Sequence, residues 1–386
     1  MVSEKMTNFN KEERTRFFFA IINSLIILLG YVIYINASNL FQVHFSERHD
    51  LAEYARLSIF GSLVTGAIMM VSFLKKMQRL YYQRFLLGVL ILVLLVLPVS
   101  IYTYPMISGL SYATLNLANA WRQLYVPNVV RGAITGITTG LTGIIDLNSI
   151  EIEYSWAKDI VRYHYVLASL VVCLFLFWRL SLKLNNTKIT IEQEKIKIES
   201  LYTVIKKYPY VFLCCFLGGF NETIFYYTYI LGGEALPNLP ITTYQYIFCF
   251  GGIVVPMITG FIADRFGMFR MLIATILILV ICKLFDAILA FSGITLAIPY
   301  YITAFIEAGL SSSSLSLALL GESLAAKGVF RLMAFGVMLL SFGAACCSYC
   351  YGQFIGSFVL TKLCMSIINI FFVGLILYLY SRRVPL

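Results

Sequence analysis

The sequence predicts an all-α membrane protein of twelve transmembrane helices, arranged as two pseudo-symmetric six-helix bundles with both termini in the cytoplasm. Three observations support this prediction. The 386 residues are 60% hydrophobic and 12% charged, whereas about 25% charged residues is usual for soluble domains. Apolar runs long enough to cross a bilayer recur along the chain. The basic residues gather in alternate connections between these runs.

The apolar runs define the predicted spans and the division of the chain. A span needs about 20 mainly apolar residues. Runs of this length lie near residues 17–40, 53–74, 85–104, 106–126, 130–149, 164–182, 209–231, 243–262, 271–291, 295–319, 329–350 and 355–380. The polar stretch 183–208 divides them six and six, into a first half over residues 1–182 and a second half over 209–386. This linker mixes both signs of charge with Ile at roughly helical spacing, which predicts an amphipathic cytoplasmic helix.

The basic residues predict the orientation and account for the net charge of +10. With the N-terminus inside, most of the 29 Lys and Arg residues fall on the inner face. Lys283 remains within a span, and the outer face receives Arg48, Arg56, Lys158, Arg162 and Lys362. The positive charge therefore faces anionic inner-leaflet lipid and does not predict nucleic-acid binding. We expect an integral multi-pass protein of the plasma membrane, which in a bacterium is the inner membrane.

The sequence predicts no metal site, no cofactor and no enzyme active site. All nine Cys lie in apolar runs, as expected of small buried hydrophobic residues. Cys346, Cys347 and Cys350 have a spacing found in metal sites, but no His or acid lies close to them in the sequence. The three His residues all lie near predicted outer ends. A catalytic constellation of nucleophile, base and orienting group is therefore not predicted.

One short charged motif identifies a family resemblance. Residues 260–270, between spans eight and nine, read Gly-x-x-x-Asp-Arg-x-Gly-x-x-Arg. Together with twelve spans and a basic middle linker, this motif resembles the signature turn of the major facilitator superfamily. Pro127-x-x-x-Arg131-Gly132 also resembles that family's turn between spans four and five. The architectural resemblance covers the whole chain, and the motifs cover about thirty residues of it.

The resemblance implies a cytoplasmic gate. In the family this turn holds the cytoplasmic side shut in the outward-facing state, together with a carboxylate near the end of span ten. The implied gate residues are Gly260, Asp264, Arg265, Gly267, Arg270, Glu322, Arg331 and Arg131.

The residues of the motif are physically suited to such a role. Asp264 can bind the positive N-terminal end of a neighbouring helix, and Gly260 and Gly267 permit a tight turn and a close helix approach. The corresponding turn over residues 71–84 is basic but has neither Gly nor Asp, so we expect an asymmetric gate. The alternative is a solvated loop that only obeys the positive-inside rule.

Polar residues inside the spans are the candidate substrate and proton sites, because burying an ionisable group in a membrane is costly. The family resemblance places spans one, four, seven and ten along a central cavity. The candidates are Glu222, Asn221, Tyr226, Tyr229, Glu307, Ser311, Ser314 and Tyr34. Glu222 leads, because Tyr226 and Tyr229 follow it on the same helical face.

Each of these interpretations has a structural alternative. A neighbouring helix can satisfy Glu222, and the serine run from Ser311 to Ser314 can simply let helices pack closely. Lys283 and Asp286, at i and i+3, are predicted to neutralise each other. Span five carries Gly132, Gly136, Gly140 and Gly143, a spacing that mainly allows close helix contact.

The resemblance implies a monomeric secondary active transporter of a small polar organic solute, coupled to protons and surrounded by membrane lipid. The solute is an amino acid, another metabolite or a siderophore-like molecule, and the direction of transport stays open. The alternative is a drug or metabolite exporter working as a proton antiporter, although span five lacks Gly-Pro and span one lacks an acid. A transport-inactive receptor or scaffold is more remote, because intramembrane carboxylates are retained.

Overall fold

The computed structural model describes residues 21, 24, 119, 122, 123, 126, 128–152, 205–222, 241–310, 312–324, 330–353 and 358–382. Spans one to four and six, as well as the linker helix, lie largely outside the described residues. Their number, the two-bundle division and the location of both termini therefore stay predictions.

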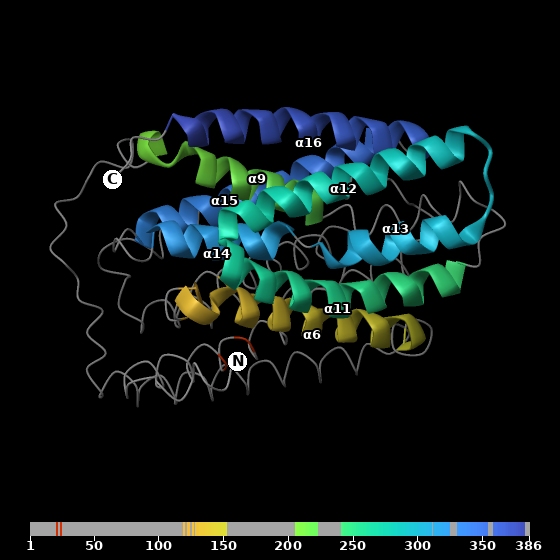
Figure 1. Cartoon of the computed structure of the whole chain (residues 1–386), viewed down its shortest axis with the longest axis horizontal. Coiled ribbons are helices and arrows are strands. Elements are labelled where there is room, and N and C mark those ends of the chain that lie inside the picture. The colour runs from red at the N-terminus through yellow and green to blue at the C-terminus, as the bar shows by residue number, and fades with distance from the viewer. Residues whose placement is uncertain are drawn as a thin grey trace, which may run out of the picture.

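Within the described residues the regular elements are all helical (Figure 1). They are η2 Asn128–Val130, α6 Arg131–Ile152, α9 Pro209–Glu222, α11 Ile241–Phe266, α12 Met268–Phe291, α13 Ala297–Gly309, α14 Ser312–Leu324, α15 Phe330–Gln353 and α16 Phe358–Ser381. The helices run roughly along the long axis of the view, with α16 and α6 on opposite sides. These elements correspond to predicted spans five and seven to twelve.

In the part of the chain that the structure describes, four helical stretches are long and apolar enough to cross a membrane. They are Thr243–Phe266, Met268–Phe291, Ala297–Ser323 and Phe358–Ser381. Their outward faces are apolar as well: Ile281 on α12 and Ile367 on α16 are each 65% exposed. A helix that is apolar all round is typical of a membrane span, because lipid replaces water on its outer side.

The core of the described region lies in the second half. Helix α9 packs against α14, α15 and α16, and α12 packs against α16. Leu217, Leu272, Leu320, Leu340 and Ile376 come from five of these helices and are fully buried. Helix α6 instead packs against α11, so this pair joins the first half to the second.

The charged motif adopts a different local structure from the predicted turn. Helix α11 does not stop near residue 262 but continues through Phe266, so Gly260 and Asp264 lie on its last turns. Gly267 is the single non-helical residue before α12, with φ of 93°, a conformation that favours glycine. Its N–H donates to the Ala263 carbonyl over 2.9 Å, and its own carbonyl accepts from Met271 at 3.1 Å.

Predicted span ten is two helices and not one. Helix α13 ends at Gly309 and α14 begins at Ser312, while Leu310 between them has φ of −84° and ψ of 52°. Glycine lowers helix propensity, and serine side chains compete for backbone hydrogen bonds. The Gly309–Ser312 sequence therefore provides a local cause for the break.

Candidate functional site

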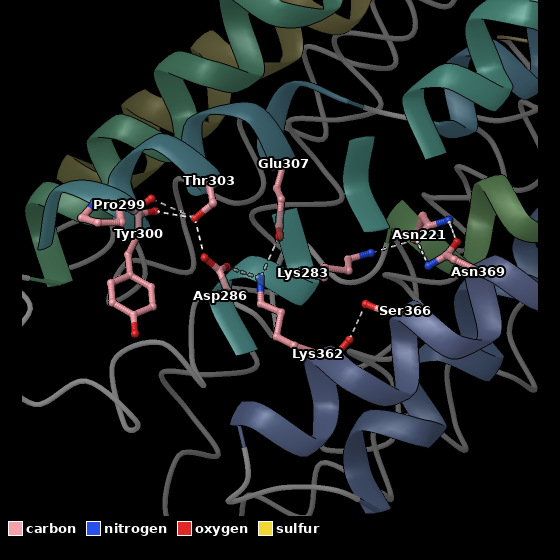
Figure 2. A network of polar contacts seen from close by, with 10 residues as sticks. All are labelled: Asn221, Lys283, Asp286, Pro299, Tyr300, Thr303, Glu307, Lys362, Ser366 and Asn369. Atoms are coloured by element: carbon pink, nitrogen blue, oxygen red, sulfur yellow. Dashed lines mark hydrogen bonds and ion pairs between the residues drawn. The ribbon is translucent and has the colours of Figure 1, made fainter. Parts of the chain in front are cut away.

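The most strongly charged part of the described interior is a cluster in the second half, which we call the Lys362 cluster (Figure 2). It consists of Lys362 on α16, Asp286 on α12, and Glu307 and Thr303 on α13. Lys362 Nζ lies 2.9 Å from Asp286 Oδ2 and 2.8 Å from Glu307 Oε2. The Thr303 hydroxyl donates to Asp286 Oδ1 over 2.6 Å. One ammonium thus holds two carboxylates from two other helices.

A second polar group lies beside the first and joins α9, α12 and α16. Lys283 Nζ donates to Asn221 Oδ1 over 3.0 Å. The Asn221 and Asn369 amides exchange hydrogen bonds of 2.7 and 3.0 Å. Lys283 is also within electrostatic range of Glu307. These three residues are all buried, so the group extends the charged interior from α13 to α9.

The structure corrects two sequence predictions about these charges. The predicted self-neutralising pair is wrong, because Asp286 pairs with Lys362 and Lys283 bonds to Asn221. The outer-face position of Lys362 is also wrong, because its side chain is only 2% exposed and lies within α16. Both errors have one cause, because the sequence does not show which helices are neighbours. It therefore does not show that Lys362 lies between two carboxylates of other helices, or that Lys283 lies beside Asn221.

The described charges of this region balance. Two ammonium groups accompany two carboxylates, and each charged side chain has a partner within hydrogen-bonding distance. Removing one member of such a buried set is strongly destabilising, since it leaves an uncompensated charge. Glu307 also lies just before the break between α13 and α14.

The second candidate site is a contact between the halves that we call the Asp264 clasp. Asp264 Oδ1 accepts from the Gly132 N–H at 2.7 Å, and Oδ2 accepts from the Ala133 N–H at 2.8 Å. These N–H groups belong to the first turn of α6, where they have no partner within the helix. The carboxylate also complements the positive helix end. The sequence suggested that Asp264 can bind the N-terminus of a neighbouring helix without naming one, and in the structure that helix is α6.

Small residues bring α6 and α11 together below the clasp, in what we call the glycine crossing. A Cβ added to Gly132 would lie 2.3 Å from the Gly260 carbonyl oxygen, and one added to Gly260 would lie 2.2 Å from that of Gly132. Gly136 and Gly140 likewise face the carbonyls of Pro256 and Ile253. The glycine stripe therefore lets the backbones touch, as the structural alternative predicted.

The remaining predicted gate residues differ in how deeply they are buried. Arg131 is buried, and it lies within electrostatic range of both Glu322 and Asp264. Glu322, Arg265 and Arg270 are exposed. Arg131, from the first half, is therefore a buried cation near the carboxylates of Asp264 and Glu322. Arg331 lies in α15, but its side chain is outside the described residues.

Further polar contacts cross between the halves near the clasp. The Thr139 hydroxyl donates to Ser314 Oγ over 2.8 Å, which joins α6 to α14. A Cβ at Gly321 would lie 2.6 Å from Arg131 Nη1 and 2.6 Å from Gln123 Cβ. Helix α14 therefore lies directly against residues of the first half. Ser314, a candidate substrate residue, therefore takes part in the contact between the halves.

Several candidates from the sequence cannot be placed. The side chain of Glu222, the last residue of α9, lies outside the described residues, as do Tyr34, Tyr226, Tyr229 and Ser311. Asn221 and Glu307 are brought into one connected polar region, and Ser314 lies apart from it on α14. Within the described part, no three His, Cys, Asp or Glu side chains gather as a metal site would require.

The sequence interpretation missed Lys362, Asn369, Thr139 and Arg122. Lys362 was detectable, since it lies only a few residues inside a predicted span and an ionisable residue there signals a buried partner. Asn369 and Thr139 are neutral and give no comparable signal. Arg122 was assigned to the inner face as an orientation signal, yet the structure buries it.

Comparison with known proteins gives matches at the level of structure. No family model matches the chain, and no curated protein matches it. The solved structure of the proton:xylose symporter XylE, of the major facilitator superfamily, has a TM-score of 0.65 and 12% identity, covering 95% of this chain and 96% of its own.

Two further solved structures are similar over nearly the whole chain. The E. coli fucose:proton symporter FucP has a TM-score of 0.60 and 11% identity, over 95% of this chain and 98% of its own. A bacterial homologue of the iron transporter ferroportin, in an outward-facing state, has a TM-score of 0.61 and 13% identity. The match covers 93% of this chain and 100% of that one. The chain therefore has the major facilitator superfamily fold, and its long apolar helices make it an integral membrane protein.

Proposed function

We propose that the protein is a secondary active transporter, which moves a small polar organic solute by alternating access and couples this movement to protons. The observation that carries the proposal is the Asp264 clasp, because it joins the two halves of a transporter fold by a contact that can open. XylE and FucP, which share this fold, are described as proton symporters.

The contacts between the halves are of a kind that can be exchanged for water. Asp264 accepts hydrogen bonds from backbone N–H groups, and Thr139 donates one to Ser314. Water can replace each of these hydrogen-bond partners when the helices separate. In the predicted orientation, this end of α11 faces the cytoplasm. The described conformation is then closed to the cytoplasm, and opening it requires the clasp to break.

Glu307 is the proton-carrying group that the described charges favour. Protonating it leaves Lys362 bound to Asp286 alone and weakens the attachment of α13 to α16. Glu307 faces Lys362 and Asp286 directly, with Lys283 and Tyr244 within electrostatic range of the cluster. Because α14 follows Glu307 after a break and touches α6, the proton state can influence the clasp. Glu222 is the second candidate, on the sequence argument alone.

Transport into reconstituted vesicles tests this proposal. We expect the wild type to accumulate at least one solute from a panel of sugars, amino acids and organic acids when a pH gradient is imposed. The sign of the effective gradient separates import from export. Glu307→Gln should abolish gradient-driven accumulation while leaving exchange of the solute across the membrane intact, since a proton-coupling group is not required for exchange.

One control variant and two contradicting outcomes complete the test. Lys207→Gln removes an exposed charge outside the site and should leave transport unchanged. Gradient-dependent accumulation that survives in both Glu307→Gln and Glu222→Gln would rule out coupling through these residues. Absence of accumulation and exchange for every solute would contradict the transporter itself.

A further inference from the structure

Arg122 is a fully buried cation on the first-half side of the clasp. It is only 1% exposed, and its guanidinium donates to Asn119 Oδ1 at 2.5 Å and to Ser24 Oγ at 3.4 Å. Thr138 on α6 bonds to the same Ser24 hydroxyl over 3.0 Å. Arginine has five N–H donors, and Nε–H has no acceptor in the described part of the chain.

The described groups to which Arg122 donates, Asn119 and Ser24, are both neutral. Unlike Arg131, which lies near Glu322 and Asp264, Arg122 has no carboxylate in electrostatic range among the described residues. The six predicted spans of the first half contain two carboxylates, Glu53 and Asp146, and both lie at ends predicted to be extracellular, whereas Arg122 lies near the opposite end. On the side of Arg122, the first half carries carboxylates only in the N-terminal tail, at Glu4, Glu12 and Glu13, outside the predicted spans.

A buried charge without a counter-charge is strongly unfavourable, so such groups are paired in proteins or meet a ligand of opposite charge. The planar guanidinium suits carboxylate and phosphate, which can accept two parallel hydrogen bonds from it. We propose that Arg122, with Asn119 and Ser24 holding its head, binds the anionic group of the transported solute. This inference rests on the proposed function and narrows its substrate to a carboxylate or phosphate compound.

The contacts beside Arg122 explain how a solute would reach it. Gln123, the next residue, packs against Gly321 of α14 and donates to the Thr135 hydroxyl over 2.9 Å. Its Oε1 and two nitrogens of Arg131 have no hydrogen-bond partner in the described region. Separation of α14 from α6 would uncover Gln123 and Arg131, and Gln123 is the residue next to Arg122 in the chain. The anion site is therefore closed by the same contacts as the predicted gate and becomes available when they open.

Thermal unfolding of the full-length protein in detergent tests the site directly. The probes are succinate, L-glutamate and inorganic phosphate, with D-xylose as the neutral probe and choline as the cationic one, all at constant ionic strength. We expect at least one anion to raise Tm saturably, because a ligand that binds only the folded state stabilises it. Which anion acts separates a carboxylate solute from a phosphate one.

Variants then assign the effect to Arg122. Arg122→Gln should weaken the apparent affinity for that anion by about tenfold or more, whereas the exposed-site control Lys207→Gln should retain it. Arg122→Lys keeps the charge and serves if the first variant folds poorly. It should also bind more weakly, because an ammonium cannot offer two parallel donors from one plane.

Several results would overturn the site. These are the absence of a shift with every anion, an equal shift in the wild type and Arg122→Gln, or an equal loss in Lys207→Gln. Vesicle transport separates this failure from that of the proposed function. If only neutral or cationic solutes accumulated, the transporter proposal would stand and the anion site would be wrong. If an anion bound in an Arg122-dependent way but nothing was transported, the site would stand and the transporter proposal would be wrong.

Discussion

The interior of the second half and the boundary between the halves use buried polar groups in opposite ways. In the Lys362 cluster every charged side chain has a partner, and the partners come from different helices of one bundle. At the boundary the contacts are a carboxylate on backbone N–H groups, a hydroxyl pair and touching glycines. The first arrangement fixes helices relative to each other, whereas the second joins surfaces that can part.

The unpaired donors and acceptors sharpen this contrast. Six buried side-chain polar atoms of the described residues have no hydrogen-bond partner, and four of them belong to Arg122, Gln123 and Arg131. The other two are the hydroxyls of Thr275 and Thr361 in the second half. Unsatisfied charged and amide groups therefore gather at the boundary, where opening or a ligand can satisfy them. We interpret the fully paired charges of the Lys362 cluster as stabilising one bundle. We interpret the unpaired groups at the boundary as a sign of a second conformation in which they gain partners.

The largest effect should come from Lys362→Met. This change leaves Asp286 and Glu307 buried without their ammonium, and we expect the unfolding free energy to fall by about 3–5 kcal/mol. Thermal unfolding of the purified protein measures it. Adding Glu307→Gln should recover part of the loss, and Lys207→Met, at an exposed site, should cost almost nothing. If Lys362→Met left the unfolding free energy unchanged but altered the conformation, the Lys362 cluster would not be the stabilising region. It would then have the conformational role that we assign to the boundary.

A smaller effect, on conformation, should follow from Gly260→Ala. The added Cβ would lie 2.2 Å from the Gly132 carbonyl oxygen, and overpacking of this kind costs about 1–3 kcal/mol. Because the clash exists only while α6 and α11 touch, it should shift the population toward the inward-open state. Labelling of Thr139→Cys by an impermeant maleimide from the cytoplasmic side should accelerate. Gly374→Ala, with nothing within 4 Å of the added atom, is the matched control.

The smallest effect should come from Asp264→Asn. Asparagine keeps one acceptor for the α6 N-terminus but loses the charge, which is worth about 0.3–1 kcal/mol at a helix end. The same labelling assay should show a modest rise, in the same direction as for Gly260→Ala. Unchanged accessibility of Thr139→Cys would count heavily against a gating role for the clasp, and the boundary would then be a permanent interface.

The sequence predicted the elements of the described region better than their partners. Spans seven to nine, eleven and twelve appear near their predicted positions, because apolar run length is a local property of the chain. The break in span ten was missed, although Gly309 and the serines that follow were visible. Apolar length alone does not distinguish one helix from two joined end to end.

The candidate site shows the same limit. The sequence indicated that Asp264 can bind a helix end, because a carboxylate complements the positive end of the helix dipole. It did not indicate α6 as the target, and it paired Lys283 with Asp286 because they are close along one helix. The observed pairing depends on which face of α12 turns toward α9 and which toward α13 and α16.

The sequence by itself determined an all-α membrane protein, its glycine stripe and its charged hinge at residues 260–270, because hydrophobicity, small-residue spacing and backbone freedom act over a few neighbouring residues. Only the tertiary structure decided that Lys362 would hold Asp286 and Glu307, that Asp264 would cap α6, and that Arg122 would be buried among neutral groups. Those outcomes depend on helix rotation and packing across long sequence separations. Electrostatic pairing is decided by distance in space, which the order of residues does not specify.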